Sequence, residues 1–235
     1  MSSRWGPVWG KTLSKYLEGD LEVVSASAGA LSGGSTAHAD AAFEAEGPSN
    51  ESVGIILFIV SEAVMFGAFF AQYFYNRILS DGWPNRAGLP AEFERVPAFP
   101  LPVVLTVVLV ASGFTAHWAQ NAIRRDDRDG FQGWLIVTIL LGLSFLAGQA
   151  YEYTNLIVTE GFSITSGIYG TVFFSLTGLH GIHVTVGVLV LIGVLIRAFL
   201  GHFSSRSHFG VEGTVLYWHF VDAVWIALYV TLYAL

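Results

Sequence analysis

The sequence predicts an all-α membrane protein with five transmembrane helices, and three observations lead to this fold class. Of the 235 residues, 53% are hydrophobic and only 12% are charged, and the mean hydropathy is +0.57, which exceeds the usual range for soluble domains. Apolar segments long enough to cross about 30 Å of hydrocarbon recur along the chain. Polar segments separate them, as expected for loops outside a bilayer.

The composition also excludes several classes of function. The chain has no cysteine, so disulfides, thiolate metal sites and cysteine nucleophiles are excluded. The formal net charge of -7 is spread over both signs without a basic block. Nothing in this pattern indicates nucleic-acid binding or a polybasic lipid tether.

The chain has two regions of different composition. Residues 1–51 are rich in Ala, Ser and Gly in their second half and contain no long apolar run, which predicts a polar, largely flexible cytoplasmic tail. They also lack the apolar core of a secretory signal. Trp5, Trp9 and Tyr16, with lysines between them, leave a short interfacial helix as the alternative. Residues 52–235 form the predicted membrane domain.

The first predicted span, residues 53–75, contains a single charge, Glu62. A helix of this length is roughly 35 Å long, which places Glu62 near mid-membrane. A carboxylate there is costly unless it is neutral or partnered, so Glu62 indicates a function or a subunit contact. No Lys or Arg lies within the span cores, so we expect Glu62 to be largely neutral and hydrogen-bonded. Ala63, Gly67 and Ala71 recur at every fourth position, which predicts close approach of a helix from a partner subunit.

The other four spans follow from the same length and hydropathy criteria. Pro102 falls in the first turn of the second span, where a missing amide donor costs nothing. The charged turn RRDDRDG separates the second and third spans, and the fourth is long enough to tilt or protrude. The predicted ranges are residues 101–122, 133–151, 168–198 and 213–235.

The distribution of Lys and Arg predicts a cytoplasmic N-terminus and a C-terminus outside. In this orientation eight basic residues lie in inner segments and three in outer ones, or five against three without the tail. The inner residues are Arg4, Lys11, Lys15, Arg124, Arg125, Arg128, Arg197 and Arg206, and the outer ones are Arg77, Arg86 and Arg95.

Polar residues inside the last two spans are candidates for chemistry. His180 and His183 are three residues apart and share a helix face, and His219 and Asp222 repeat this spacing. Imidazole and carboxylate ligands suit zinc, iron or copper, but the same pairs also serve as hydrogen-bonded struts between helices. A b-type haem between His117 and His219, at similar predicted depth, is a sharper alternative.

Four sequence strings resemble subunit III of the haem-copper terminal oxidases. They are TSGIYGTVFFSLTGLHGIHVTVG from Thr165, SHFGVEGTVLYWHFVDAVWIALYVTLY from Ser207, GQAYEY from Gly148 and SEAVMF around Glu62. The resemblance covers residues 52–235, and the two longest strings are highly specific. It implies a core subunit of a respiratory oxygen reductase in the bacterial plasma membrane. Such a subunit supports aerobic electron transport, proton uptake and pumping, and the stability of the catalytic subunit.

The resemblance also implies roles for individual residues. Glu62 matches the family's membrane-buried, carbodiimide-reactive carboxylate. Positions near phospholipid headgroups and the inner surface match Arg197, His202, His208 and Glu212.

Other matched positions are structural in the family, which lowers the weight of a metal site. They are His180, His183, His219 and Asp222. By this resemblance the chain binds no redox cofactor itself, because haem and copper belong to partner subunits. The implied partners are oxidase subunits I and II, cytochrome c or another electron donor, and membrane phospholipid.

The chain departs from the longer family members, which have seven helices in two bundles with lipids in the cleft between them. In this chain the polar tail replaces the first two helices, so that cleft is not implied. Five-helix members occur in quinol-oxidising enzymes and in some bacterial cytochrome c oxidases. Glu62 favours the cytochrome c branch, because quinol-type members can carry Asp at this position. A small b-type membrane cytochrome is a further alternative, whereas the inverted repeats typical of a transporter are not found.

Overall fold

The computed structural model describes residues 49–79, 83–84, 96–97, 100–204 and 208–234. The chain divides into two compact units, Met1–Val53 and Gly54–Leu235, and the second contains the helical bundle. The predicted polar tail, with its alternative interfacial helix, lies almost entirely outside the described residues.

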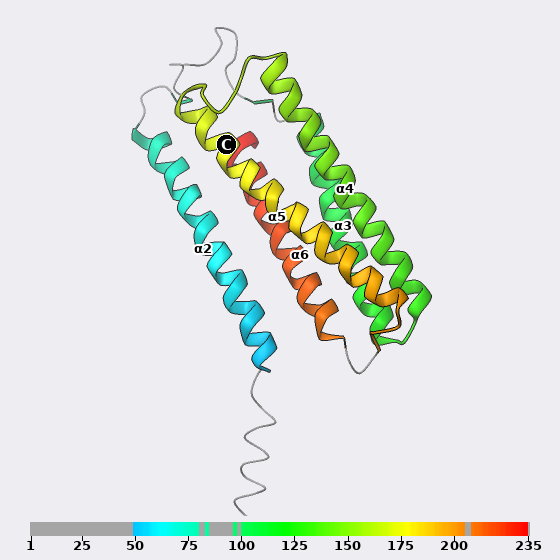
Figure 1. Cartoon of the computed structure of the whole chain (residues 1–235). Helices are drawn as coiled ribbons and strands as arrows, with labels where there is room; N and C mark the ends of the chain where they lie inside the picture. Colours follow the sequence, from blue (N-terminus) through cyan, green and yellow to red (C-terminus); the bar gives the residue numbers. More distant parts are fainter. Residues whose placement is uncertain (1–48, 80–82, 85–95, 98–99, 205–207, 235) are drawn as a thin grey trace, which may run out of the picture. The chain divides into compact units, whose positions relative to one another are not determined.

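Five helices of the described chain are long and apolar enough to cross a membrane, which confirms the predicted fold class. The orientation of the termini stays a prediction. Figure 1 shows the helices, with α2 in blue and cyan and the C-terminal helix in orange and red. They are α2 (Asn50–Leu79), α3 (Leu101–Arg124), α4 (Arg128–Val158), α5 (Gly167–Phe199) and α6 (Phe209–Leu228), and the π-helical segment η1 (Tyr229–Ala234) continues α6.

The largest difference from the predicted spans is in α4, which extends beyond residues 133–151 at both ends. Its first turn is capped by Asp127, whose carboxylate accepts a hydrogen bond of 2.9 Å from the Gly130 amide. At the other end the helix continues through Glu152, which is buried and accepts a hydrogen bond from the Tyr233 hydroxyl at 3.1 Å. Because the protein itself satisfies this carboxylate, the charge does not end the helix.

Helices α3 to α6 form a bundle in which α3 packs against α4 and α6, and α5 packs against the same two helices. Trp218 fills its centre and donates a hydrogen bond of 3.0 Å to the Ser112 hydroxyl. Gly142 and Gly187 make room for this indole, since a Cβ at either would lie 2.9 or 2.8 Å from the ring. Gly187 is thus a close-packing position, whereas a Cβ at Gly193 would meet nothing within 4 Å.

Helix α2 lies alongside this bundle and buries few of its own residues (Figure 1). Its buried side chains are Phe66 and Tyr73. The Phe66 ring contacts the rings of His183 on α5 and Phe220 on α6, at centroid distances of 5.0 and 6.3 Å. Attachment of α2 to the bundle therefore depends on a few specific contacts and not on a broad apolar seam.

The predicted small-residue stripe of α2 is exposed. Ala63, Gly67 and Ala71 all face away from the described bundle, and a Cβ at Gly67 would meet nothing within 4 Å. The stripe is free to meet another helix, and its role in subunit contact stays a prediction.

Candidate functional site

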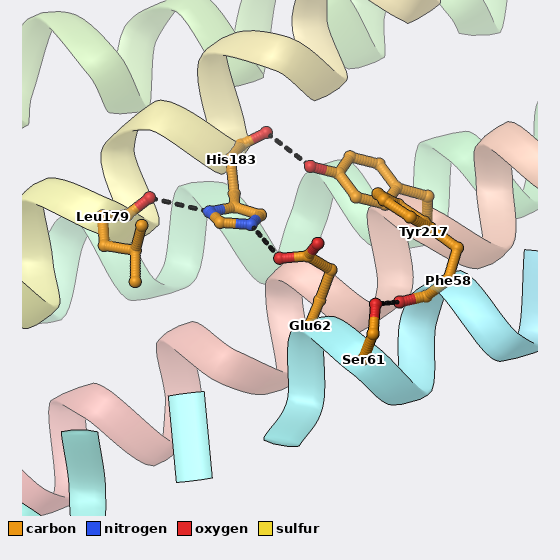
Figure 2. Close-up of polar contacts among 6 residues, drawn as sticks. All are labelled: Phe58, Ser61, Glu62, Leu179, His183 and Tyr217. Atoms are coloured by element: carbon orange, nitrogen blue, oxygen red, sulfur yellow. Dashed lines mark hydrogen bonds and ion pairs between the residues drawn. The ribbon is translucent and has the colours of Figure 1, made fainter. Parts of the chain in front are cut away.

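Glu62 forms a direct polar contact with His183 across the α2–α5 interface (Figure 2). Its Oε2 lies 2.9 Å from His183 Nε2, and the two side chains are 20% and 11% exposed. The other ring nitrogen, Nδ1, lies 2.8 Å from the backbone carbonyl oxygen of Leu179. A carbonyl oxygen only accepts hydrogen bonds, so Nδ1 carries a proton.

This fixed tautomer decides the chemistry of the pair. With Nδ1 protonated, Nε2 of a neutral imidazole is an acceptor, and the Glu62 carboxyl must then donate the proton. In the alternative arrangement the proton lies on Nε2, and the pair consists of a carboxylate and an imidazolium. Both arrangements have the same net charge and hold one proton between Oε2 and Nε2.

A third helix completes the surroundings of the pair. The Tyr217 hydroxyl of α6 donates a hydrogen bond of 3.2 Å to the His183 carbonyl oxygen. Within α2, the Ser61 hydroxyl donates to the Phe58 carbonyl at 2.7 Å, and Phe58 packs on Tyr217 at a ring-centroid distance of 6.0 Å (Figure 2). Side chains of α2, α5 and α6 therefore converge at the pair, and Phe66 covers the imidazole from the side.

The hydrogen-bonding partner expected for Glu62 is His183, and the neutral state of Glu62 stays a prediction. In the sequence, the i, i+3 spacing placed His183 beside His180. In the structure the polar partner of His183 is Glu62, which lies 121 residues away in the sequence. An intramembrane histidine and an intramembrane carboxylate were both recognised. No feature of either string indicated that they meet.

His180 occupies different surroundings from His183, although the two share an approximate helix face. It is fully buried, stacks on Trp225 at a centroid distance of 5.2 Å and meets the edge of Phe145 at 5.8 Å. Within the described chain neither of its ring nitrogens has a hydrogen-bond partner. The i, i+3 spacing therefore does not bring the two histidines into one site.

His219 and Asp222 do lie near each other, with 3.9 Å between His219 Nδ1 and Asp222 Oδ2. They line a groove of about 360 Å³ between α3 and α6, and His117 lines the same groove. The structure thus brings together the two histidines of the haem hypothesis. Among the described residues, no group of three or more His, Cys, Asp or Glu side chains is placed to hold a metal ion.

The four predicted lipid or surface residues separate into two groups. Glu212 Oε1 accepts one hydrogen bond of 2.6 Å from Arg124 and lies 3.3 Å from His208 Nε2. Arg197 lies instead over the Phe203 ring, with 5.0 Å between its guanidinium carbon and the ring centroid. His202 is exposed in the link that follows α5.

The contact between Glu152 and Tyr233 was not predicted from the sequence. Nearby, the Gln149 amide donates to the Thr177 carbonyl at 2.9 Å, and the Tyr153 hydroxyl lies 2.6 Å from the Thr177 hydroxyl. The feature of the sequence that could have indicated this contact is the presence of Gln149 and Glu152 within one helical turn at the end of an apolar span. These contacts tie α4 to α5 and η1.

Comparison with known proteins decides the family. The model of the cytochrome c oxidase subunit III family matches residues 38–235. The chain belongs to this family. Two similar relatives are cytochrome c oxidase subunit 3 of Synechocystis sp. (42% identity over 189 residues, 80% of this chain and 77% of the relative) and of Thermostichus vulcanus (37% over 191 residues, 81% and 90%). The rat subunit 3 is 41% identical over 185 residues, covering 77% of this chain and 67% of the relative.

Family membership confirms the resemblance inferred from the four strings. The chain is subunit III of a haem-copper oxidase, and so belongs to a proton-translocating oxidoreductase complex of several subunits. Its helices agree with a multi-pass membrane protein.

Proposed function

We propose that this subunit III carries no redox centre and supports the catalytic subunit by keeping proton supply in step with oxygen reduction, through the Glu62–His183 pair. The observation that carries the proposal is the 2.9 Å contact between Glu62 Oε2 and His183 Nε2, with Nδ1 of the same ring 2.8 Å from the Leu179 carbonyl oxygen. Glu62 lies on a helix with few other buried contacts to the bundle, so we propose that the pair responds to a neighbouring subunit.

The pair is suited to hold a proton inside a membrane. Isolated carboxylates are expensive there, but the Glu62–His183 unit has the same net charge whichever partner carries the proton. A proton can therefore shift within the unit without creating an unpaired buried charge. In the resting state we propose the neutral arrangement, in which the Glu62 carboxyl donates to His183.

The wider assignment follows from the family. We propose that haem and copper reside in partner subunits I and II, that cytochrome c is the electron donor, and that the complex lies in a bacterial plasma membrane. Glu at position 62, and not Asp, supports cytochrome c over a quinol. Phospholipid headgroups are proposed to bind at the basic end of the bundle, near Arg197, His202, His208 and Glu212.

Glu62→Gln tests the proposal in the reconstituted complex. Glutamine keeps the shape and hydrogen-bonding capacity of the side chain but removes its titratable proton. We expect slower initial oxygen consumption, less proton pumping per electron, or faster loss of activity over many turnovers. Thr185→Ala on the exposed face of α5 is the matched control, because Thr185 bonds only within its own helix in the described chain.

The outcome that contradicts the proposal is equally specific. Wild-type values for all three measurements in a fully assembled Glu62→Gln complex would leave Glu62 with a purely structural role, tying α2 to α5. The assignment to the complex fails if the chain never co-purifies with other oxidase subunits in mild detergent.

A further inference from the structure

A groove with a volume of about 320 Å³ lies between α3 and α4, next to the turn that joins them. It combines two indole rings with an amide and two opposite charges, and none of its residues is part of the Glu62–His183 pair. The groove is lined by Trp118, Asn121, Ala122, Arg125, Asp127 and Trp134.

Both helices contribute to the groove. Trp118, Asn121 and Arg125 are spaced three and four residues apart, so they follow one another along one side of α3. Trp134 of α4 lies beside Trp118, with 4.8 Å between the ring centroids. The two side chains are 38% and 46% exposed, respectively. The described chain therefore leaves a large part of this aromatic surface uncovered.

The position of the groove along the helices matches the edge of a bilayer. Trp118 precedes Arg124, the last residue of α3, by six residues, and Trp134 follows Arg128, the first residue of α4, by six residues. At 1.5 Å per residue, both indoles lie about 9 Å from the charged turn. The headgroup region is about 5–8 Å thick on each side of a bilayer. The indoles thus reach the level at which acyl chains begin, whereas the turn lies at the level of the headgroups.

The turn supplies two exposed charges of opposite sign, Arg125 and Asp127. Within the described chain no carboxylate pairs with the Arg125 guanidinium, whereas its neighbour Arg124 is bound to Glu212 of α6 at 2.6 Å. The Asp127 carboxylate accepts a hydrogen bond from the Gly130 amide, and no basic side chain of the described residues pairs with it. Both charges are therefore available to a ligand in the groove.

We propose that this groove binds one zwitterionic phospholipid, with its phosphate at Arg125, its primary ammonium at Asp127 and the first part of an acyl chain on the two indoles. A guanidinium donates several N–H groups to phosphate oxygens. A primary ammonium has three N–H donors, which match the acceptor oxygens of a carboxylate. Phosphatidylethanolamine carries both headgroup charges and the acyl chains in one molecule, so its chemistry matches the whole groove.

Other phospholipid classes match only part of the groove. The phosphatidylglycerol headgroup has a phosphate but no cation, so the Asp127 carboxylate would face an anion. The choline headgroup has a cation without an N–H group, so it donates no conventional hydrogen bond to Asp127. This site shares no residue with the headgroup positions proposed above from the family, and its selectivity follows from its own two charges.

Photochemical labelling of the complete oxidase complex in proteoliposomes tests the site. The probe is a phosphatidylethanolamine with a diazirine near the ester of one acyl chain, and labelled peptides are identified by mass spectrometry. We expect label on peptides that contain Trp118 or Trp134. Excess phosphatidylethanolamine should reduce this label more than the same excess of phosphatidylglycerol or phosphatidylcholine. Label near Ile182, on the exposed face of α5, reports ordinary lipid contact and should respond equally to all three lipids.

Three substitutions in the turn separate the two charges. Arg125→Gln should lower the label on the tryptophan peptides by about 5-fold to 20-fold, as expected for loss of a charge-assisted contact with phosphate. Asp127→Asn keeps an acceptor for the Gly130 amide and so preserves the helix cap, but phosphatidylglycerol should then compete as well as phosphatidylethanolamine. Arg128→Gln makes the same charge change outside the groove and should leave the label unchanged.

The contrary outcomes are distinct from failure of the proposed function. Equal competition by all three lipids in the unmodified chain, or equal labelling of Arg125→Gln, would overturn the selective site and leave only general contact with the bilayer. Absence of label from both tryptophan peptides in the complete complex would overturn it as well, because another subunit would then cover the groove. Failure of the unmodified chain to co-purify with any oxidase subunit would instead contradict the proposed function.

Discussion

Glu62 and Asp222 are both carboxylates near the middle of membrane-spanning helices, but they differ in what lies within reach. Glu62 is on the loosely attached helix α2, and the His183 imidazole is 2.9 Å away. Asp222 is on the tightly packed helix α6, is more deeply buried, and has an oxygen without a partner in the described chain. The depth of burial therefore does not indicate whether an intramembrane acid is satisfied, because that depends on the facing helix.

The two sites also differ in how they relate to the rest of the molecule. The Glu62–His183 contact is one of few that join α2 to the bundle, so it combines attachment with the proposed proton site. The Asp222 groove lies on a bundle that already has an aromatic core of its own. Loss of His183 should thus affect the attachment of α2, whereas the bundle should tolerate the loss of Asp222.

The largest effect is expected when the central side chain of the bundle core is removed. Trp218→Ala empties the space between Gly142 and Gly187 and removes the hydrogen bond to Ser112. We expect a loss of about 3–5 kcal/mol in the free energy of unfolding, as for other large aromatic deletions. Denaturation of the detergent-solubilised chain, followed by circular dichroism, measures it. A change below about 1 kcal/mol would show that the bundle core is not organised around this indole.

An intermediate effect is expected when the partner of Glu62 is removed. His183→Leu leaves the carboxyl group without its hydrogen bond, which should cost about 2–3 kcal/mol in unfolding free energy and loosen α2. The double variant with Glu62→Leu removes both polar groups, so it should lose less stability than the sum of the two single changes. Additive losses in this cycle would mean that the two side chains do not interact.

Four of the five spans could be predicted within about four residues at each end, because apolar length is a local property. The first and last residues of α3 and α5 lie close to the predicted ends, while α4 is longer because buried Glu152 has a partner in η1. Glu62 was also recognised, since a lone charge in an apolar helix is visible in the string itself.

The contacts of the site could not be predicted in the same way. The pairing of Glu62 with His183 depends on how α2 is rotated and shifted against α5, and no single-helix pattern contains that information. The i, i+3 spacing of His180 and His183 was misleading because the three-residue step still rotates one ring toward Trp225 and the other toward α2. The close packing of Asp222 against α3 depends on Gly113 of that helix, where a Cβ would overlap Asp222 Oδ2, and no pattern within α6 indicates it.

A smaller effect on the chain itself is expected at Asp222. In the detergent-solubilised subunit, Asp222→Leu removes a buried carboxylate that has no partner for Oδ1 in the described chain, so unfolding free energy should stay within about 1 kcal/mol of the original or increase. The same denaturation assay measures it beside His183→Leu. A loss as large as that of His183→Leu would indicate that Asp222 is satisfied within the chain, which would remove the difference between the two acids.

The smallest expected effect concerns the haem spectrum of the complex. His117 and His219 line one groove, as a bis-histidine haem would require, but this chain belongs to a family for which we propose that redox centres reside in partner subunits. His117→Asn, His219→Asn, His180→Asn and His183→Asn should therefore leave the visible haem spectrum of the assembled complex unchanged. Asparagine is chosen because it retains polarity at each position but is a poor iron ligand. The spectrum must be recorded per assembled complex, since His183→Asn can also weaken the attachment of α2 and lower the yield. Stoichiometric loss of one haem signal from His117→Asn and His219→Asn, but not from the other two, would assign a haem to the α3–α6 groove.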